Sequence, residues 1–222
     1  MGKRQADLTG RRIAELVKGV DEKFGPCRIK ILHVSNMTRA KETADLIAQH
    51  LPSVERGEPD PLLNEGSPAH TIPGGKASKS HIERLDEGHP RIEAAFQKYF
   101  YREEFKEKPE KLPETLEGQP DAIADPVDAT ESNPTGIRVH DEDEDCKHEF
   151  EIIVCHANVI RYFICRALQL PPEAWLRICT FNCSLTYFTI RPTGTVSIRS
   201  LGDVGHLPYG LTSFSMHHGF NW

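Results

Sequence analysis

Apolar residues recur along the chain with periods that predict several helices. A stripe at positions i, i+3, i+4 and i+7 predicts an N-terminal amphipathic helix, and it consists of Ile13, Leu16, Val17 and Val20. A second stripe precedes Pro52, which ends the helix, and it consists of Ala40, Thr43, Ala44, Ile47 and Leu51. Pro90 is predicted to open a third helix, because proline at a first helical turn costs no hydrogen bond. The inward face of that helix is Ile92, Ala95, Phe96 and Tyr99.

Short apolar runs between these helices predict strands. Residues 29–34 and 150–155 are short and rich in β-branched side chains, which is typical of buried parallel strands. Residues 159–168 are apolar on nearly all sides and predict a buried helix. Residues 184–190 and 195–200 predict a hairpin, since Pro192 and Gly194 between them suit a type I turn. Strands that alternate with helices predict an α/β fold, with a mostly parallel sheet covered on both faces.

Two stretches lack apolar periodicity. Residues 52–90 are rich in Pro, Gly, Ser and His and predict an irregular excursion up to the third helix. Residues 105–149 contain scattered prolines and the unbroken acidic run 141–145, which predicts a disordered insertion. The predicted organisation is therefore one domain over 1–208 interrupted at 105–149, with a tail at 209–222.

Composition excludes several classes of function. The formal net charge of −6 argues against a nucleic-acid partner, which requires a concentrated basic surface. No stretch approaches the roughly 20 apolar residues that a membrane-spanning helix needs. The six cysteines form no CxxC pair, which favours free thiols over a disulfide framework. His140, Cys146 and His148 lack a fourth ligand at zinc-type spacing, so no metal site is predicted.

Candidate chemistry lies where two strands end and helices begin. The segment SNMTRAKETA at 35–44 places Arg39 in a first helical turn, where its guanidinium and free backbone N–H groups together suit a phosphate. The segment HANVIRY at 156–162 places His156 at a strand end, where it can contact the same phosphate or move a proton. Taken singly, Arg39 could instead be a surface ion-pair residue and His156 an ordinary packed histidine.

The two segments together resemble the phosphoglycerate mutase-like histidine phosphatases, in which S-x-x-x-R-A-x-x-T-A and a later strand-end histidine bracket the phosphate. The chain is most similar to the branch of mitochondrial serine/threonine protein phosphatases. That likeness is carried by LLNEGSP, RIEAAFQKYF, CHANVIRYFICRALQLPPEAWLRI and SLTYFTIRPTGTVSIRSLGDVGHLP. It covers about residues 2–208, interrupted at 105–149, and implies a three-layer sandwich.

The resemblance also implies roles for three residues. Arg39 matches the phosphate-binding arginine, His156 the second active-site histidine, and Glu65 in LLNEGSP the acid that protonates the leaving group. The alternative for Glu65 is a solvated loop carboxylate, and the functional reading is favoured over it. The family needs no cofactor, so none is expected. The resemblance implies phosphoproteins as substrates and a homo-oligomer as a further possibility. It implies a mitochondrial location, with the cytoplasm as the alternative if Met1 is the true start.

The family takes up the phosphoryl group on a histidine in an R-H-G segment at the end of its first strand, forming phosphohistidine. The sequence printed contains no R-H-G, and its first residues align with the helix that follows that strand. The resemblance therefore implies a protein phosphatase whose nucleophile segment is absent from these 222 residues, with impaired or no activity. Two alternatives stay open: a non-catalytic phosphate-binding scaffold, and a metabolic mutase acting on phosphoglycerate.

Overall fold

Three parallel strands form the central sheet in a computed structural model of the protein, which describes residues 1–70, 79–101 and 148–214. Their spatial order is β2 (Glu55–Arg56), β1 (Cys27–Val34) and β3 (His148–Val154). β1 and β3 pair from Cys27 opposite His148 to Val34 opposite Val154, so the carboxyl ends of both strands lie at the same edge. The strand predicted at 29–34 is confirmed, and it starts two residues earlier.

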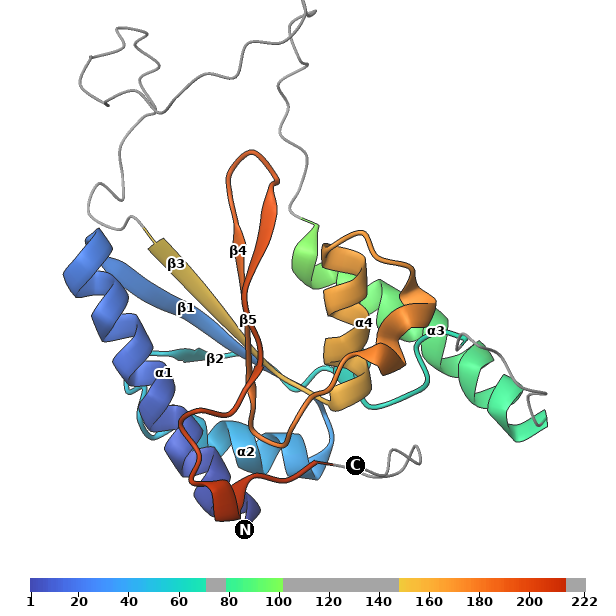
Figure 1. Cartoon of the computed structure of the whole chain (residues 1–222), viewed down its shortest axis with the longest axis horizontal. Helices are drawn as coiled ribbons and strands as arrows, with labels where there is room; N and C mark the ends of the chain where they lie inside the picture. Colours follow the sequence, from blue (N-terminus) through green and yellow to red (C-terminus); the bar gives the residue numbers. More distant parts are fainter. Residues whose placement is uncertain (71–78, 102–147, 215–222) are drawn as a thin grey trace, which may run out of the picture. The chain divides into compact units, whose positions relative to one another are not determined.

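Helices cover both faces of this sheet (Figure 1). α1 (Gly2–Phe24) and α2 (Thr38–Ala48) share one apolar cluster with β1 and with Ile152 and Val154 of β3. α3 (Lys79–Phe100) and α4 (Ala157–Ala167) form a second cluster, into which Ile153 packs. Successive side chains of a strand point to opposite faces, which explains why neighbouring residues of β3 belong to different clusters. The predicted α/β fold with a parallel sheet covered on both faces is confirmed.

An antiparallel hairpin follows, formed by β4 (Leu185–Ile190) and β5 (Val196–Asp203). The backbone N–H of Gly194 donates to the carbonyl of Arg191 at 2.8 Å and closes the turn. Gly194 has a φ of +81°, a value that glycine adopts without a steric penalty. The described residues also contain short 3₁₀ helices, at Pro61–Leu63, Pro172–Arg177 and Tyr209–Leu211.

The third helix differs from its prediction. In the described residues it begins at Lys79 and passes through Pro90, so residues 79–90 are helical rather than irregular. A proline inside a helix removes one backbone hydrogen bond. Contacts on either side of Pro90 hold the helix in place: the Nδ1 atom of His89 bonds the carbonyl of Pro68, and Arg91 donates to three carbonyls between Leu62 and Glu65.

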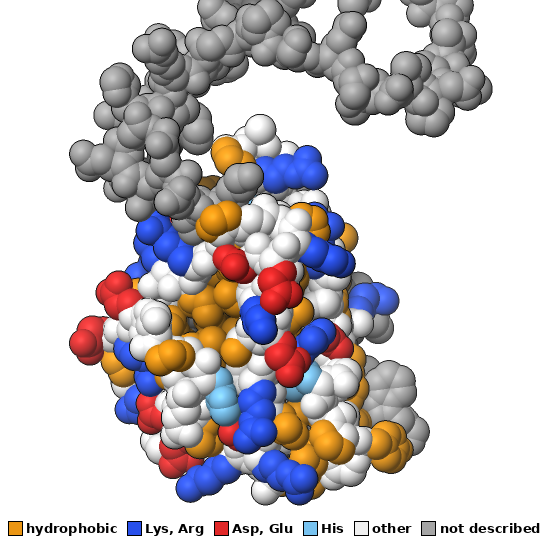
Figure 2. Space-filling model, turned by 90° about the vertical axis from the view of Figure 1, so that its left-hand side faces the viewer, with side chains coloured by type: hydrophobic (Ala, Val, Ile, Leu, Met, Phe, Trp, Pro, Cys, Tyr) orange, Lys and Arg blue, Asp and Glu red, His pale blue; other side chains and the backbone are white. Residues whose placement is uncertain are grey.

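The insertion predicted at 105–149 lies outside the described residues except for its last two. His148 and Glu149 belong to β3, so the strand begins two residues before the predicted start at 150. The Arg28 guanidinium donates to the Glu149 carboxylate at 2.8 Å across the paired strands in this extension. On the face of the molecule shown in Figure 2, positively and negatively charged side chains are interspersed around an apolar area.

The buried face of α1 is shifted from the predicted stripe. Leu16 is 37% exposed, whereas the buried residues of α1 are Gln5, Ala6, Thr9, Gly10 and Ile13. α1 packs mainly on α2 through small side chains near its N-terminal half, and hydrophobic periodicity alone gives small residues little weight. Within the three described ranges, none of the helices combines the length and apolar composition needed to cross a membrane.

Gly10 lies directly against α2 and the residues that follow it. A Cβ atom there would lie 3.0 Å from the Ile47 Cα and 2.7 Å from a ring carbon of His50, whereas a Cβ at Gly19 meets nothing within 4 Å. Gly10→Ala is therefore expected to lower the free energy of unfolding by about 1–3 kcal/mol through overpacking. Gly19→Ala in the same helix should raise it by about 0.5–1 kcal/mol. Urea denaturation of both variants tests this, and equal effects would contradict the close approach.

Candidate active site

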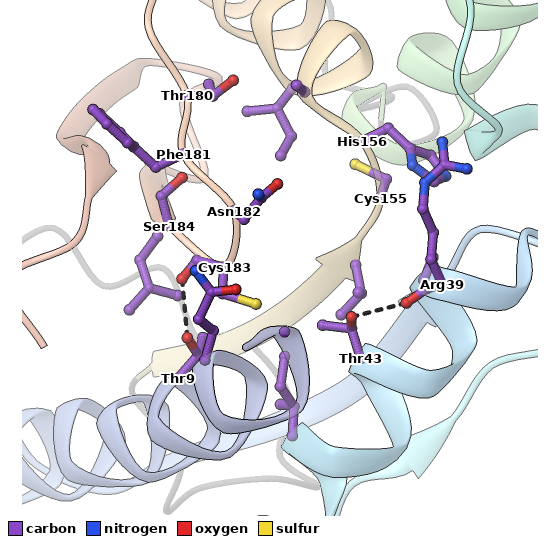
Figure 3. Close-up of a pocket in the computed structure, with 18 of the residues that line it drawn as sticks. Thr9, Arg39, Thr43, Cys155, His156, Thr180, Phe181, Asn182, Cys183 and Ser184 are labelled. Atoms are coloured by element: carbon purple, nitrogen blue, oxygen red, sulfur yellow. Dashed lines mark hydrogen bonds between the residues drawn. The ribbon is translucent and has the colours of Figure 1, made fainter. Parts of the chain in front are cut away.

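A cavity of about 930 Å³ opens at the carboxyl end of the parallel sheet (Figure 3). Its wall is formed by the N-terminal half of α1, the start of α2, the end of β3, the start of α4 and residues 180–185. Arg39, Glu65 and His156 all line it. The sheet explains this: β1 and β3 are parallel neighbours, so the segments that follow them meet at one edge.

Arg39 lies in the first turn of α2, and Figure 3 shows its guanidinium directed toward the His156 ring. Met37 precedes the helix and supplies no side-chain cap, and the first turn contains no acidic residue. The positive end of the helix dipole and the guanidinium are therefore both available to an anion in the cavity.

His156 is the residue before α4 and is only 6% exposed. Its Nε2 atom lies 2.8 Å from the Ser35 hydroxyl oxygen, and that hydroxyl donates to the Oδ1 atom of Asn64 at 2.8 Å. Since the only proton of Ser35 goes to Asn64, the Ser35 oxygen accepts from His156, which fixes the neutral imidazole as the Nε2–H tautomer. The Nδ1 atom of His156 is then the unprotonated ring nitrogen, and it takes no part in the bond to Ser35.

Burial lowers the pKa of His156 to about 4, and the charges of Arg39 and Arg91 act in the same direction. The imidazole is thus neutral at pH 7 when no anion is bound. A phosphate dianion beside it would favour the protonated ring, which can donate through Nδ1 to a phosphate oxygen.

The depressed pKa predicts a pH dependence of stability. Unfolded His156 takes up a proton below about pH 6.5, whereas the folded residue stays neutral to about pH 4. The unfolded state therefore binds more protons in this window, and stability is lost as pH falls through it, by up to about 3 kcal/mol. Denaturant unfolding of wild type and His156→Asn at pH 7 and pH 4.5 measures the difference. A parallel decline in both proteins would contradict the assignment.

Glu65 follows Asn64 in the loop after the first 3₁₀ turn and is half-buried. Burial raises the pKa of its carboxyl, while a backbone hydrogen bond from Gly66 and the charge of Arg39 act in the opposite direction. The loop is held from α3, because the Arg91 guanidinium donates to the carbonyls of Leu62 and Asn64 at 2.8 and 2.7 Å and to that of Glu65 at 3.1 Å.

Asn158 and Arg161 of α4 also line the cavity. The Asn158 amide donates to the carbonyl of Gly66 at 3.1 Å, and Arg161 donates to the carbonyl of Ile178 at 2.8 Å. Both side chains thus support the loops around the start of α4. Arg161 adds a second positive charge to the cavity wall, beside that of Arg39. Both arginines share the wall with Glu65, and burial favours the protonated form of its carboxyl.

Two cysteines of the wall are unsuited to nucleophilic attack. Burial raises the pKa of the Cys155 thiol to about 12 and that of Cys183 to about 11. Neither is a thiolate at neutral pH, and the thiolate is the reactive form. Among the described residues that line the cavity, His156 is the single imidazole. The wall therefore combines two arginines, one carboxyl and one imidazole around the same cavity.

Three supporting residues were not identified as part of the site from the sequence. Ser35 opens the SNMTRAKETA segment, Asn64 belongs to LLNEGSP and Arg91 begins RIEAAFQKYF. Each lies within a segment that carries the family likeness, which is the signal that could have indicated them. Their contacts join segments far apart in the chain, and no local pattern predicts such pairs.

Three comparisons relate the chain to known proteins. The sequence model of the histidine phosphatase superfamily (branch 1) matches residues 1–203. The chain is 39% identical over 215 residues to the mitochondrial serine/threonine-protein phosphatase Pgam5 of Caenorhabditis elegans, covering 97% of this chain and 59% of that protein. It is 40% identical over 208 residues to the human protein of that name, covering 94% and 55%. The chain thus spans less than two thirds of these relatives.

Among solved structures, the phosphoglycerate mutase of Plasmodium falciparum is similar, with a TM-score of 0.52 and 28% sequence identity. The similarity covers 93% of this chain and 86% of that one.

Proposed function

The chain belongs to the histidine phosphatase superfamily (branch 1), and from that membership we propose that its cavity hydrolyses phosphate esters of serine and threonine side chains in proteins. The observation that carries the proposal is the convergence of Arg39, Glu65 and His156 on one cavity. The arginine binds the phosphoryl oxygens, the glutamic acid supplies a proton and the imidazole contacts the group being transferred.

The chemistry runs in two steps. A nitrogen of an accepting imidazole attacks phosphorus, the bond from phosphorus to the side-chain oxygen breaks, and that oxygen takes the proton of Glu65. A water molecule then gives a proton to the Glu65 carboxylate and attacks phosphorus, the phosphorus–nitrogen bond breaks, and phosphate leaves. The protonated Glu65 matters because an alkoxide is a poor leaving group. Arg39 holds the phosphoryl charge throughout.

The described residues supply three of the four groups in this scheme. His156 donates Nε2–H to Ser35, so it is oriented to bind phosphate through Nδ1 and serves as the second imidazole. The accepting imidazole that the family places in an R-H-G segment does not occur in the printed sequence and has to reach the cavity from elsewhere.

The substrate class rests on the relatives. The curated relatives are named as serine/threonine phosphatases, whereas the similar solved structure is named as a phosphoglycerate mutase. We therefore expect phosphoproteins as substrates. We also propose a mitochondrial location, because these relatives are named mitochondrial.

The test is turnover by the protein expressed from its own gene. Phosphoserine and phosphothreonine peptides should be dephosphorylated, and 3-phosphoglycerate should react at least about a hundred-fold more slowly. Binding of the phosphopeptides without phosphate release would favour a non-catalytic scaffold. Preferred turnover of phosphoglycerate would favour a metabolic enzyme.

The raised pKa of Glu65 predicts the alkaline side of the pH profile. The protonated carboxyl is the active form, so kcat/KM should fall as pH rises through its pKa. Glu65→Gln should lower kcat/KM about a hundred-fold and remove this decline, because the amide does not titrate. Glu58→Gln, an exposed residue of the preceding loop, is the matched control. An unchanged alkaline decline in Glu65→Gln would assign the acid to another group.

A further inference from the structure

The Arg91 guanidinium binds the backbone of the loop that carries Glu65. Arg91 is half-buried on α3, and it donates four hydrogen bonds to carbonyls of that loop. Its Nη1 atom lies 3.3, 2.8 and 2.7 Å from the carbonyl oxygens of Pro61, Leu62 and Asn64, and its Nη2 atom lies 3.1 Å from that of Glu65. Four carbonyl dipoles thus converge on one cation, which stabilises a backbone arrangement in which they would otherwise repel one another.

Other contacts hold the two ends of this loop. At its start, the Asp60 carboxylate accepts from the Lys98 ammonium at 2.7 Å and from the Tyr99 hydroxyl at 2.6 Å, about two turns further along α3. At its end, the Asn158 amide of α4 donates to the carbonyl of Gly66 at 3.1 Å. The guanidinium binds the middle of the loop, between these two ends.

The same guanidinium is connected to the imidazole of the site. The carbonyl of Asn64 accepts from Arg91, while the side-chain oxygen of Asn64 accepts from the Ser35 hydroxyl. Ser35 in turn accepts from His156. Because the guanidinium is planar and rigid, it fixes the adjacent carbonyls of Asn64 and Glu65 together. One side chain therefore sets the acid and the imidazole relative to each other.

Glycine at position 66 leaves room for the guanidinium. A Cβ atom at Gly66 would lie 2.6 Å from the Nη2 atom of Arg91, well inside the distance at which non-bonded atoms attract. Gly66 is not among the glycines with a positive φ, so alanine fits its backbone conformation. Gly66→Ala is therefore expected to displace the guanidinium and to keep the course of the loop backbone.

We infer that Arg91 is a positioning residue for protonation of the leaving group, because it holds the Glu65 carboxyl in place relative to Ser35 and His156. The inference rests on the proposed function, in which Glu65 is the acid. Arg91→Lys keeps the positive charge, but one ammonium group has three donors on a single atom and cannot replace the planar fork. The loop then relaxes, and its carboxyl turns toward solvent.

The kinetic test compares two substrates that differ in the leaving group. Threonine leaves phosphorus as an alkoxide that needs a proton, whereas the nitrophenolate of p-nitrophenyl phosphate leaves without one. In the protein expressed from its own gene, Arg91→Lys and Gly66→Ala should lower kcat for a phosphothreonine peptide by roughly ten- to hundred-fold. Their kcat for p-nitrophenyl phosphate should fall only about three-fold. Arg84→Lys, at an exposed position of the same helix, is the matched control.

The second test needs no turnover. The carboxyl carbon of Glu65 is titrated by NMR in the 222-residue chain, and its signal is assigned by its absence in Glu65→Gln. Burial raises the pKa of this carboxyl. Arg91→Lys conserves the charge, so loss of position should lower the pKa of Glu65 toward its ordinary value as water reaches the carboxyl. Arg84→Lys should keep the wild-type pKa.

The inference predicts a lower pKa of Glu65 in Arg91→Lys and Gly66→Ala, together with a loss of kcat that is much larger for the phosphothreonine peptide. Equal losses for the two substrates, or an unchanged pKa of Glu65 in both variants, would overturn it, as would the same effects in Arg84→Lys. If the wild-type protein turns over neither substrate and the pKa still falls, the placement of Glu65 by Arg91 stands and the proposed function fails.

Discussion

Arg39→Ala is expected to lower kcat/KM for a phosphothreonine peptide by about a thousand-fold in the protein expressed from its own gene. The guanidinium lines the cavity at the start of α2 and is the cation that Figure 3 shows beside His156. Its charge-assisted hydrogen bonds to phosphoryl oxygens would be absent from both the bound substrate and the transition state. The loss should therefore appear in KM and in kcat.

Two further variants define this effect. Arg39→Lys should recover part of the loss, since lysine restores the charge and not the bidentate geometry. Lys41→Ala removes a positive charge from the same helix at a residue that is not among those lining the cavity, and its activity should stay within about two-fold of wild type. Equal losses in Arg39→Ala and Lys41→Ala would show a general charge effect and not a phosphate contact.

His156→Asn is expected to lower kcat by about a hundred- to ten-thousand-fold. The imidazole is buried and held by Ser35, so it cannot be replaced by a neighbouring side chain. Asparagine is a favourable residue before a helix, so the start of α4 should be kept. Steady-state kinetics with a phosphothreonine peptide, beside a denaturation curve, separates loss of chemistry from loss of folding.

Ser35→Ala tests how His156 is positioned. The variant removes the acceptor of the Nε2–H group and should reduce kcat about ten-fold, with a shift in the acidic limb of the pH profile that a purely structural defect would not cause. Wild-type kinetics in Ser35→Ala would mean that the tautomer is set by another group. Full activity in His156→Asn would remove the imidazole from the mechanism.

Much of this arrangement could be predicted from the sequence, because it depends on local patterns. The apolar runs in β1 and β3 predicted parallel strands, and parallel strands end at one edge, which brings Arg39 and His156 together. The turn before β5 contains a glycine where the backbone needs a positive φ. These patterns involve only a few neighbouring residues, so they can be recognised without knowing how the chain packs.

Other features depend on contacts between distant segments. Pro90 predicted a helix start, yet α3 continues through it because His89 and Arg91 are held by the loop at 62–68. Of the predicted stripe, Ile13 and Val17 pack in the apolar cluster of this face, whereas Leu16 is exposed because α1 packs on α2 through small residues such as Gly10. The Ser35 and Asn64 contacts that orient His156 likewise depend on the folded chain.

The central claim is that Arg39, Glu65 and His156 form one phosphate site, and a crystal structure of the 222-residue chain with tungstate tests it most directly. Tungstate is a tetrahedral dianion like phosphate, and its anomalous scattering locates the metal atom independently of the protein. The account predicts a peak with oxygens within about 3 Å of the Arg39 guanidinium and of the Nδ1 atom of His156. A peak at another place, with this cavity empty, would contradict it.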